Sequence, residues 1–169
     1  MKKVEARELA LALRKEKDVM VSSRKVLDDI IASRLLDKYQ HIGIYYPIGK
    51  EMNLMPLVDI YRDKNFYLPI TRDEISFVEY KKNDILVDGP FKTKEPQGDI
   101  IKRDNIECFI IPCVAISNHQ RIGYGKGYYD RYLKDYQGTI IGICYKDSVF
   151  ECEMDEFDCK IDILLVGWF

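Results

Sequence analysis

The sequence lacks several patterns that would assign it to a particular class of protein. No two of its five cysteines are spaced as C-x-x-C, which argues against a structural zinc site. No uninterrupted apolar run approaches the roughly 20 residues of a membrane-spanning helix, so we expect no membrane partner. The first residues have no apolar core, so we expect no signal peptide. Basic and acidic residues nearly balance, at 26 and 28, so no overall field indicates a nucleic-acid partner.

What is present is typical of an ordinary globular protein. Of the 169 residues, 47% are hydrophobic and 32% are charged, which predicts one domain over residues 1–169 with a sizeable core. The widely spaced cysteines indicate small buried side chains in a reducing, cytoplasmic compartment. We expect a monomer. The cysteines are Cys108, Cys113, Cys144, Cys152 and Cys159.

Helical and strand patterns alternate along the chain. Apolar spacing predicts helices over residues 2–17 and from Ser22 or Ser23 to about Tyr39, the second with Ile30 and Ile31 facing inward. Strands are predicted over residues 41–46, 65–69, 75–80, 107–115, 139–145 and 161–166, with the last strand end packed against the body. This order predicts an α/β fold, a three-layer α/β/α sandwich around a mostly parallel, mixed sheet in a single domain.

The most informative segment runs from residue 121 to residue 131. Three glycines alternate there with Tyr124 and Lys126, and a helical pattern follows. Alternating glycines leave backbone N–H groups uncovered, and a helix N-terminus adds partial positive charge. Because Arg121 and Lys126 add full charges, we expect this segment to bind a polyphosphate. Asp130, one helical turn later, is placed to hold the accompanying Mg²⁺, so the segment predicts an enzyme that uses ATP.

The glycine pattern alone has other interpretations. It is not a P-loop, because Lys126 is followed by glycine and the G-x-x-x-x-G-K spacing is absent. It is not a dinucleotide fingerprint either, since the spacing is G-x-G-x-G and lies late in the chain. Without its charged residues, the same pattern equally fits a tight turn.

Two weaker features also have a functional and a plain interpretation. Lys3 and Arg7 lie four residues apart on one helix face, where they either grip phosphates or only solvate the helix. An acidic cluster near the C-terminus is either a solvated loop or a source of one Mg²⁺ ligand, for which Asp158 is the candidate. No Ser-His-Asp or Cys-His arrangement supplies a covalent nucleophile. The acidic cluster comprises Asp155, Glu156, Asp158 and Asp162.

These motifs resemble those of the 5-formyltetrahydrofolate cyclo-ligase family, also called methenyltetrahydrofolate synthetases. The strongest match is Arg121-x-Gly123-x-Gly125-x-Gly127-Tyr128-Tyr129-Asp130. Four weaker segments support it along nearly the whole chain: Lys3-x-x-x-Arg7, Tyr45-Tyr46-Pro47-x-x-x-Glu51, Gly89-Pro90-Phe91…Glu95-Pro96 and Glu156-Phe157-Asp158-x-x-x-Asp162.

The resemblance implies an ATP- and Mg²⁺-dependent ligase of folate and one-carbon metabolism. Its reaction closes 5-formyltetrahydrofolate, polyglutamylated or not, to 5,10-methenyltetrahydrofolate and releases ADP and phosphate. It proceeds by phosphorylation of the formyl oxygen and attack by N10. The resemblance implies Lys126 and Arg121 as catalytic residues and Asp130 and Asp158 as metal ligands. It implies ATP contacts at Lys3, Arg7, Arg121, Gly123, Gly125, Lys126, Gly127 and Asp130, and substrate contacts at Tyr46, Glu51, Tyr124, Gly125, Lys126, Gly127 and Tyr128.

Two other functions stay open at this point. One is a paralogue of the same fold that uses ATP on another heterocycle, and Glu51 beside Tyr46 argues against it, because the resemblance implies that both contact the folate. The other is a non-catalytic module that binds folate or nucleic acid, which the presence of both Asp130 and Asp158 disfavours. Ser148 stands where the family commonly has Gln, and we assign it no role.

Overall fold

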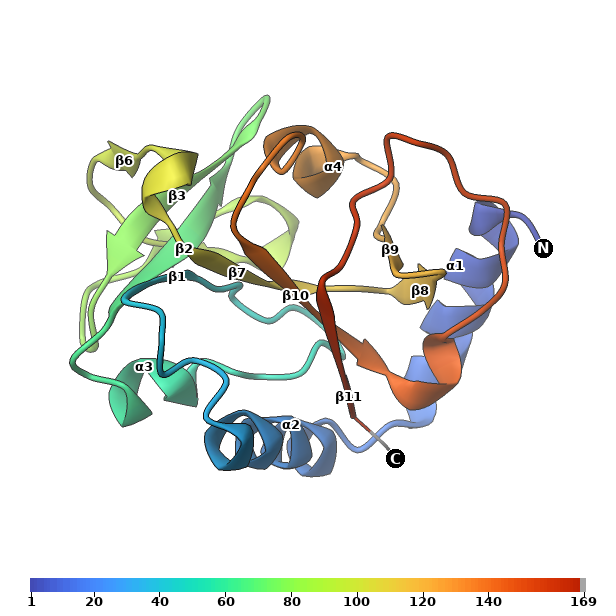
Figure 1. The fold of residues 1–169 in the computed structure, drawn as a ribbon, viewed down its shortest axis with the longest axis horizontal. Helices are drawn as coiled ribbons and strands as arrows, with labels where there is room; N and C mark the ends of the chain where they lie inside the picture. The colour runs from blue at the N-terminus through green and yellow to red at the C-terminus, as the bar shows by residue number, and fades with distance from the viewer. Residues whose placement is uncertain (168–169) are drawn as a thin grey trace.

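A seven-stranded sheet runs through the computed structural model, which describes residues 1–167 (Figure 1). Its strand order is β11-β10-β7-β1-β2-β3-β6. The five strands from β11 to β2 are mutually parallel, whereas β3 and β6 are antiparallel to their neighbours. The strands are β1 His41–Gly43, β2 Asn65–Thr71, β3 Ile75–Tyr80, β6 Ile100–Ile101, β7 Cys108–Pro112, β10 Thr139–Tyr145 and β11 Ile163–Gly167.

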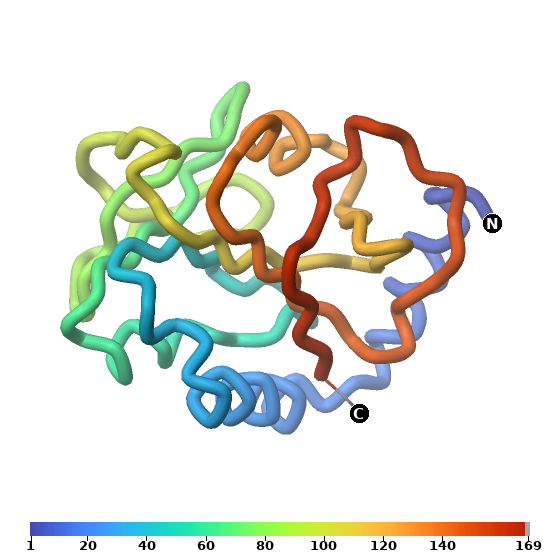
Figure 2. Tube along the Cα trace, in the orientation of Figure 1, coloured from blue at the N-terminus to red at the C-terminus, as the bar shows by residue number. Residues whose placement is uncertain are grey.

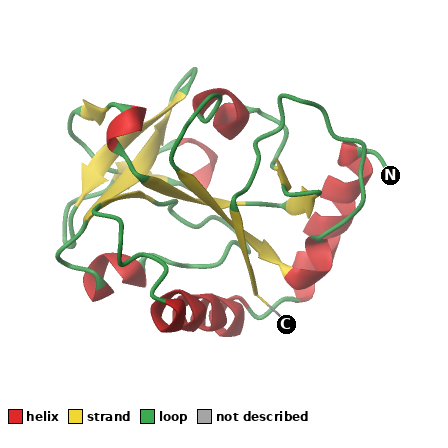
Figure 3. Cartoon of the chain, in the orientation of Figure 1, coloured by secondary structure: helices red, strands yellow, loops and turns green. Residues whose placement is uncertain are grey.

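Helices cover both faces of this sheet (Figure 3). Helices α2 (Val19–Ser33) and α3 (Pro56–Ile60) lie on one face, and α4 (Tyr128–Tyr132) lies on the other. The predicted α/β fold with a mostly parallel, mixed sheet is therefore confirmed. The remaining elements are α1 Lys3–Leu13, the short ribbons β4 Val87–Asp88 with β5 Lys94–Glu95 and β8 Ala115–Ser117 with β9 Gln120–Ile122, and the 3₁₀ turns η1 Arg14–Glu16, η2 Pro90–Lys92, η3 Arg103–Asn105 and η4 Lys146–Ser148.

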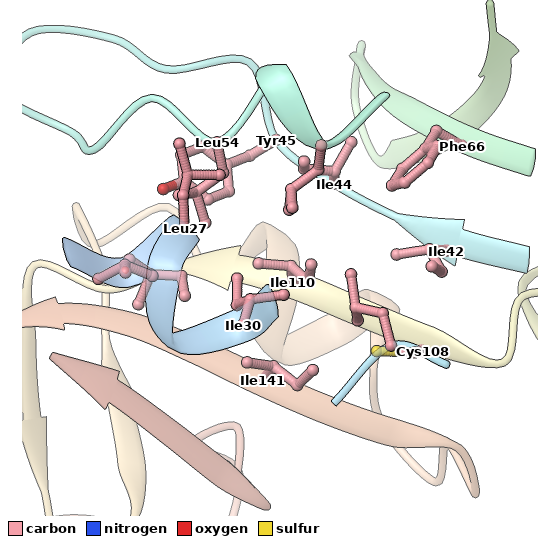
Figure 4. Packing of buried hydrophobic residues seen from close by; sticks show 14 of the residues in the cluster. Leu27, Ile30, Ile42, Ile44, Tyr45, Leu54, Phe66, Cys108, Ile110 and Ile141 are labelled. Carbon is pink, nitrogen blue, oxygen red and sulfur yellow. The ribbon is translucent and has the colours of Figure 1, made fainter. Parts of the chain in front are cut away.

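The core follows the two-residue period of the central strands. Cys108 and Ile110 of β7 face α2, whereas Phe109 and Ile111 face α4, because successive side chains of a strand point to opposite faces. Figure 4 shows the first of these two layers, with side chains of α2 packed against the sheet. Such burial of apolar surface is the main source of the fold's stability. The labelled side chains of that layer are Leu27, Ile30, Ile42, Ile44, Tyr45, Leu54, Phe66, Cys108, Ile110 and Ile141.

Helix α2 differs from its prediction at both ends and on one face. Its N-cap is Asp18, whose carboxylate accepts the Val21 N–H, while Ser22 and Ser23 are buried inside the helix. It ends at Ser33 because Arg34 adopts a left-handed conformation, with φ of 57°. Ile31, predicted to face inward, is exposed. An Asp cap was missed because several polar residues near this end were equally plausible caps.

The chain leaves β1 earlier than predicted. The strand stops at Gly43, although the Ile44 N–H still bonds the Tyr67 carbonyl. Beyond it, the Tyr45 hydroxyl donates to the Met52 carbonyl and so fixes the loop that follows. The predicted strand over residues 107–115 is likewise two elements, β7 and the start of the β8–β9 hairpin. Trp168 and Phe169, in the predicted last strand end, lie outside the described residues.

The connections of the parallel strands diverge between β1 and β7. The chain leaves β1 through α3 to reach β2 on one side, and leaves β7 through α4 to reach β10 on the other. In open α/β sheets, ligands bind at the carboxyl ends of strands where the connections part in this way. The fold therefore predicts a binding site beyond Gly43 and Pro112.

Helix α1 closes one side of this edge. Its buried Ala6 and Ala10 pack on Ala115 and Ile122 of the β8–β9 hairpin, where small side chains allow a close approach. Figure 2 shows the blue N-terminal segment beside the red segment before β11, and the Glu153 N–H bonds the Met1 carbonyl at 3.1 Å. Of the helices within residues 1–167, none has the length and apolar character needed to cross a bilayer.

Candidate active site

A cavity of about 460 Å³ lies at the carboxyl ends of β1, β2 and β7. One side of it, the tyrosine wall, consists of Tyr45, Tyr46, Ile48 and Glu51, which follow β1. The opposite side, the charged wall, consists of Lys3, Arg7, the 121–127 segment, Asp130 and Asp158. The remainder is lined by Pro69, Thr71, Ile75, Phe91, Thr93, Pro112, Tyr128 and Tyr129.

The glycines of the charged wall meet specific geometric needs. A side chain at Gly123 would place its Cβ 2.4 Å from Nη1 of Arg121, so only glycine fits over that guanidinium. Gly125 and Gly127 have φ of 102° and 72°, which glycine adopts without strain. The loop therefore needs its glycines for backbone shape as well as for exposed N–H groups.

Arg121 is folded beneath this loop. It is 8% exposed, its Nε donates to the Pro112 carbonyl at 2.7 Å, and its guanidinium carbon lies 4.6 Å from the Tyr129 ring centroid. Within residues 1–167, no carboxylate forms a salt bridge with it. A buried cation without an anionic partner favours binding of an anion from the cavity.

Helix α4 contributes less to anion binding than the sequence suggested. It is five residues long, and Gly127 at its N-cap is left-handed. Tyr136, predicted to belong to this helix, lies beyond its end at Tyr132. Because so short a helix has a weak dipole, the positive potential of this wall comes from side-chain charges instead.

Two arginines of the N-terminal helical segment hold the glycine loop. The Arg7 Nε donates to the Gly123 carbonyl at 2.6 Å, and the Arg14 guanidinium donates to the Tyr124 hydroxyl. Their seven-residue spacing places both on one side of the helix, since seven residues make nearly two turns. Arg14 was missed from the sequence, although this spacing is a signal that could have found it.

Lys3 is tightly paired with the acidic segment. Its Nζ lies 2.9 and 3.0 Å from the two carboxylate oxygens of Asp158 and 3.0 Å from Asp155. Burial works against the charged form, but these bonds prevail and raise the pKa of Lys3. The bond from Lys3 lowers the pKa of Asp155. The sequence, which placed Lys3 and Arg7 on one helix face, gave no sign of this contact, because the partners lie 152 and 155 residues away.

Asp130 and Asp158 are brought together by the backbone. Asp130 accepts the N–H of Cys159, the residue that follows Asp158, at 2.9 Å, and both carboxylates line the cavity. Asp158 already holds a cation, the Lys3 ammonium, so the pair fits Mg²⁺ chemically. Within residues 1–167, no group of three or more His, Cys, Asp or Glu residues is arranged to hold a metal ion. Asp162 instead accepts the Ile140 N–H and is structural.

Glu51 is the buried acid of the tyrosine wall. It is 8% exposed, and one of its oxygens accepts the Ile48 N–H at 2.9 Å. Burial raises its pKa to about 7, although that hydrogen bond and the charges of Arg14 and Arg121 pull it down. Near neutral pH this carboxyl therefore changes its charge readily.

Lys126 and its neighbours form the exposed rim. Lys126 lines the cavity from the exposed part of the loop, with its Nζ 6.0 Å from the ring centroid of Phe91. Phe91 is 55% exposed and left-handed, with φ of 59°. The Tyr128 hydroxyl lies 3.4 Å from the Arg72 carbonyl, across the same rim.

Every site residue predicted from the sequence borders this one cavity. They are Lys3, Arg7, Tyr46, Glu51, Arg121, Gly123, Tyr124, Gly125, Lys126, Gly127, Tyr128, Asp130 and Asp158. The sequence did not predict that residues of β2 and of the 91–93 segment line the cavity. Their contribution depends on strand pairing between distant segments. The sequence also gave no place to Ser148, which is buried with no hydrogen-bond partner for its hydroxyl in the described part of the chain.

Comparisons with known proteins agree with this geometry. The sequence model of the 5-formyltetrahydrofolate cyclo-ligase family matches residues 2–166. The chain is 31% identical over 127 residues to a 5-formyltetrahydrofolate cyclo-ligase of Mycoplasma pneumoniae, covering 73% of this chain and 71% of that protein.

Solved structures give the same relationship. The NMR structure of 5,10-methenyltetrahydrofolate synthetase from Aquifex aeolicus has a TM-score of 0.84 and 31% identity, over 97% of this chain and 89% of that one. A 5,10-methenyltetrahydrofolate synthetase from Mycoplasma pneumoniae has a TM-score of 0.78 and 26% identity, over 97% and 98%. The chain therefore belongs to the 5-formyltetrahydrofolate cyclo-ligase family, whose members are ligases of folate metabolism.

Proposed function

We propose that this enzyme closes 5-formyltetrahydrofolate to 5,10-methenyltetrahydrofolate with MgATP and releases ADP and phosphate. The observation that carries the proposal is that one cavity joins the tyrosine wall to the charged wall. The first has the buried carboxylate and rings suited to a pterin, and the second has the cations suited to phosphates. A reaction between a folate and ATP needs both within one site.

The charged wall would bind the nucleotide. Arg7, Arg121 and Lys126 supply positive charge around the glycine loop, and its backbone N–H groups add donors. Of these, Lys126 is exposed, so it can follow the γ-phosphate as charge develops in the transition state. Positioning and charge neutralisation dominate the catalysis of phosphoryl transfer, so we assign Lys126 and Arg121 to that role.

Asp130 and Asp158 would hold Mg²⁺, which would supply positive charge that neutralises the phosphates. Asp158 is engaged by Lys3 at 2.9 Å, so Lys3 must release it for the metal to enter. The freed ammonium then lies close to the incoming phosphates. Lys3 would therefore exchange a carboxylate for a phosphate when the nucleotide binds.

The tyrosine wall would bind the pterin. A carboxylate accepts hydrogen bonds from the N–H edge of the pterin, and burial of Glu51 makes an unfilled bond costly, which gives orientation and specificity. Tyr46, Tyr124 and Tyr128 offer rings and hydroxyls around the same space.

The reaction needs no nucleophile from the protein. Transfer of the γ-phosphoryl group to the formyl oxygen makes that oxygen a good leaving group. N10 then attacks the formyl carbon and loses its proton, and the C–O bond breaks to release phosphate. The absence of a Ser, Cys or His nucleophile in the sequence pattern fits a substrate that supplies its own.

The assay that tests the proposal follows the methenyl chromophore in the near ultraviolet. Purified protein is mixed with 5-formyltetrahydrofolate and MgATP, with EDTA and omission of ATP as controls. Signal that needs both ATP and Mg²⁺ supports the proposal. No signal from folded, ATP-binding protein would indicate a paralogue that acts on another heterocycle. We propose that the reaction occurs in the cytosol, consistent with five free cysteines, and in a monomer.

A further inference from the structure

Arg14 is a buried cation that stands behind the cavity and does not line it. Arg14 is 7% exposed, and within residues 1–167 no carboxylate forms a salt bridge with it. Burial of a charge without an ionic partner is costly, so its contacts call for an explanation. Arg7 and Arg121 would bind the nucleotide, whereas the only contact described so far for Arg14 is its bond to the glycine loop.

One side of Arg14 holds the glycine loop. Its Nη2 donates to the Tyr124 hydroxyl, and its guanidinium carbon lies 5.4 Å from the centroid of the Tyr124 ring. Tyr124 stands between two glycines, where the backbone has no neighbouring side chains to restrain it. Arg14 therefore restrains the side chain at the middle of the loop, in addition to the Arg7 bond to the Gly123 carbonyl.

The other side of Arg14 faces Glu51. A cavity of about 10 Å³, the size of one water molecule, lies between the two and is also lined by Tyr45 and Tyr145. The Arg14 charge acts on Glu51 across this space and lowers its pKa against the effect of burial. No salt bridge joins them within residues 1–167.

We propose that Arg14 is a positioning residue for the folate, which fixes Tyr124 through its hydroxyl and places a positive charge across a water-sized space from Glu51. This inference rests on the proposed function, because it assumes that both groups contact the folate. It assigns to Arg14 a larger effect on folate binding than on ATP binding, because Tyr124 and Glu51 would both contact the folate, whereas the nucleotide would also be held by Arg7, Arg121 and Lys126.

The test compares Arg14→Met with wild type in steady-state kinetics for each substrate. The loss of one charged contact is expected to raise KM for 5-formyltetrahydrofolate roughly 10- to 100-fold and to raise KM for ATP much less. Arg14→Lys restores the charge and is expected to recover part of the loss. Lys15→Met, an exposed neighbour in the same turn, is the matched control.

A pH profile separates positioning from general stability. Two kinds of group face Glu51. The charged ones are the cations Arg14 and Arg121. The others are neutral near pH 7, because burial raises their pKa values: the hydroxyls of Tyr45, Tyr124, Tyr129 and Tyr145 and the thiol of Cys113. Of these, Arg14 alone is removed in the variant. The acidic limb of kcat/KM for the folate should therefore shift to higher pH in Arg14→Met.

Tyr124→Phe separates the two effects of Arg14, its contact with the Tyr124 hydroxyl and its charge near Glu51. It removes the hydroxyl contact but leaves the Arg14 charge, so it should raise folate KM with no shift of the acidic limb. Equal changes in the KM of both substrates, or an unshifted limb in Arg14→Met, would overturn the inference. If wild type itself does not turn over the folate, the proposed function fails; if it does and Arg14→Met matches it, only this inference fails.

Discussion

The tyrosine wall and the charged wall of the cavity differ in how they are held before any ligand binds. Glu51 and Tyr45 are nearly fully buried and are fixed by hydrogen bonds to the backbone of their own loop. Lys3 and Asp158 are instead paired with each other across 155 residues of sequence, and Asp158 also accepts the Asp155 N–H at 2.8 Å. Groups fixed by backbone contacts set the shape of their ligand, whereas the Lys3–Asp158 pair of the charged wall must exchange partners to bind one. We therefore expect specificity from the first and metal-dependent affinity from the second.

The largest effect is expected where the charged wall meets the reacting phosphate. Lys126→Ala and Asp130→Asn should each lower kcat by roughly 100- to 1,000-fold, because each removes charge that stabilises the transition state. Lys126 is exposed, and an Asn at 130 can still accept the Cys159 N–H, so thermal unfolding should change little. Lys134→Ala, an exposed lysine off the cavity, is the control. Near-normal turnover in both variants would remove these residues from the site.

On the tyrosine wall, replacing Glu51 should make the protein more stable but less able to bind the folate. Burial raises the pKa of Glu51 from 4.5 to about 7, so the folded state binds this proton more tightly than the unfolded state. The free energy of unfolding therefore falls as pH rises from about 4.5 to 7. Glu51→Gln abolishes this loss, so at pH 8 it should be more stable than wild type, by on the order of 3 kcal/mol.

The same variant should bind the folate poorly. Folate KM should rise roughly 10- to 100-fold, since a charged acceptor is lost. Denaturant unfolding at pH 8 and pH 4 measures the stability effect, which should nearly vanish at pH 4. A variant no more stable than wild type at pH 8 would contradict the costly burial of Glu51.

An intermediate effect tests the exchange at Lys3. Lys3→Met frees Asp158, so Mn²⁺, used as a probe for Mg²⁺, should bind the nucleotide-free protein several-fold more tightly than wild type, while KM for ATP rises. Metal binding is measured by Mn²⁺ paramagnetic resonance without nucleotide. Lys2→Met is the control, as Lys2 is exposed and does not line the cavity. Weaker Mn²⁺ binding in Lys3→Met would instead show that the ammonium helps to organise the carboxylates.

The smallest effect concerns the rim that the two walls share. Phe91 faces Lys126 at 6.0 Å from its ring centroid, an exposed geometry in which a cation–π contact is weak. Phe91→Ala should lower kcat/KM by about two- to fivefold, without altering the pH profile. A loss as large as that of Lys126→Ala would place Phe91 against the ligand itself.

These two walls were not equally predictable from sequence. The charged wall was largely foreseen, because its glycines, Lys126 and Asp130 are contiguous and their spacing carries chemistry. On the tyrosine wall, the resemblance pointed to Glu51, but its burial and the Arg14 charge behind it depend on how α1 packs on the β8–β9 hairpin. The alternation of helix and strand predicted the sheet, whereas the short β1 and the Asp18 cap depended on local hydrogen bonds that several sequences satisfy.

The contact between Lys3 and Asp158 also bears on when the enzyme first becomes active. The site draws on both ends of the chain, 155 residues apart, so loop closure comes late in folding. A chain emerging from the ribosome can pair β1 with β2 long before Asp158 is made. It cannot complete the charged wall until then. On the proposed function, a nascent chain therefore cannot consume ATP, and the nucleotide can stabilise the protein only after Asp158 has been synthesised.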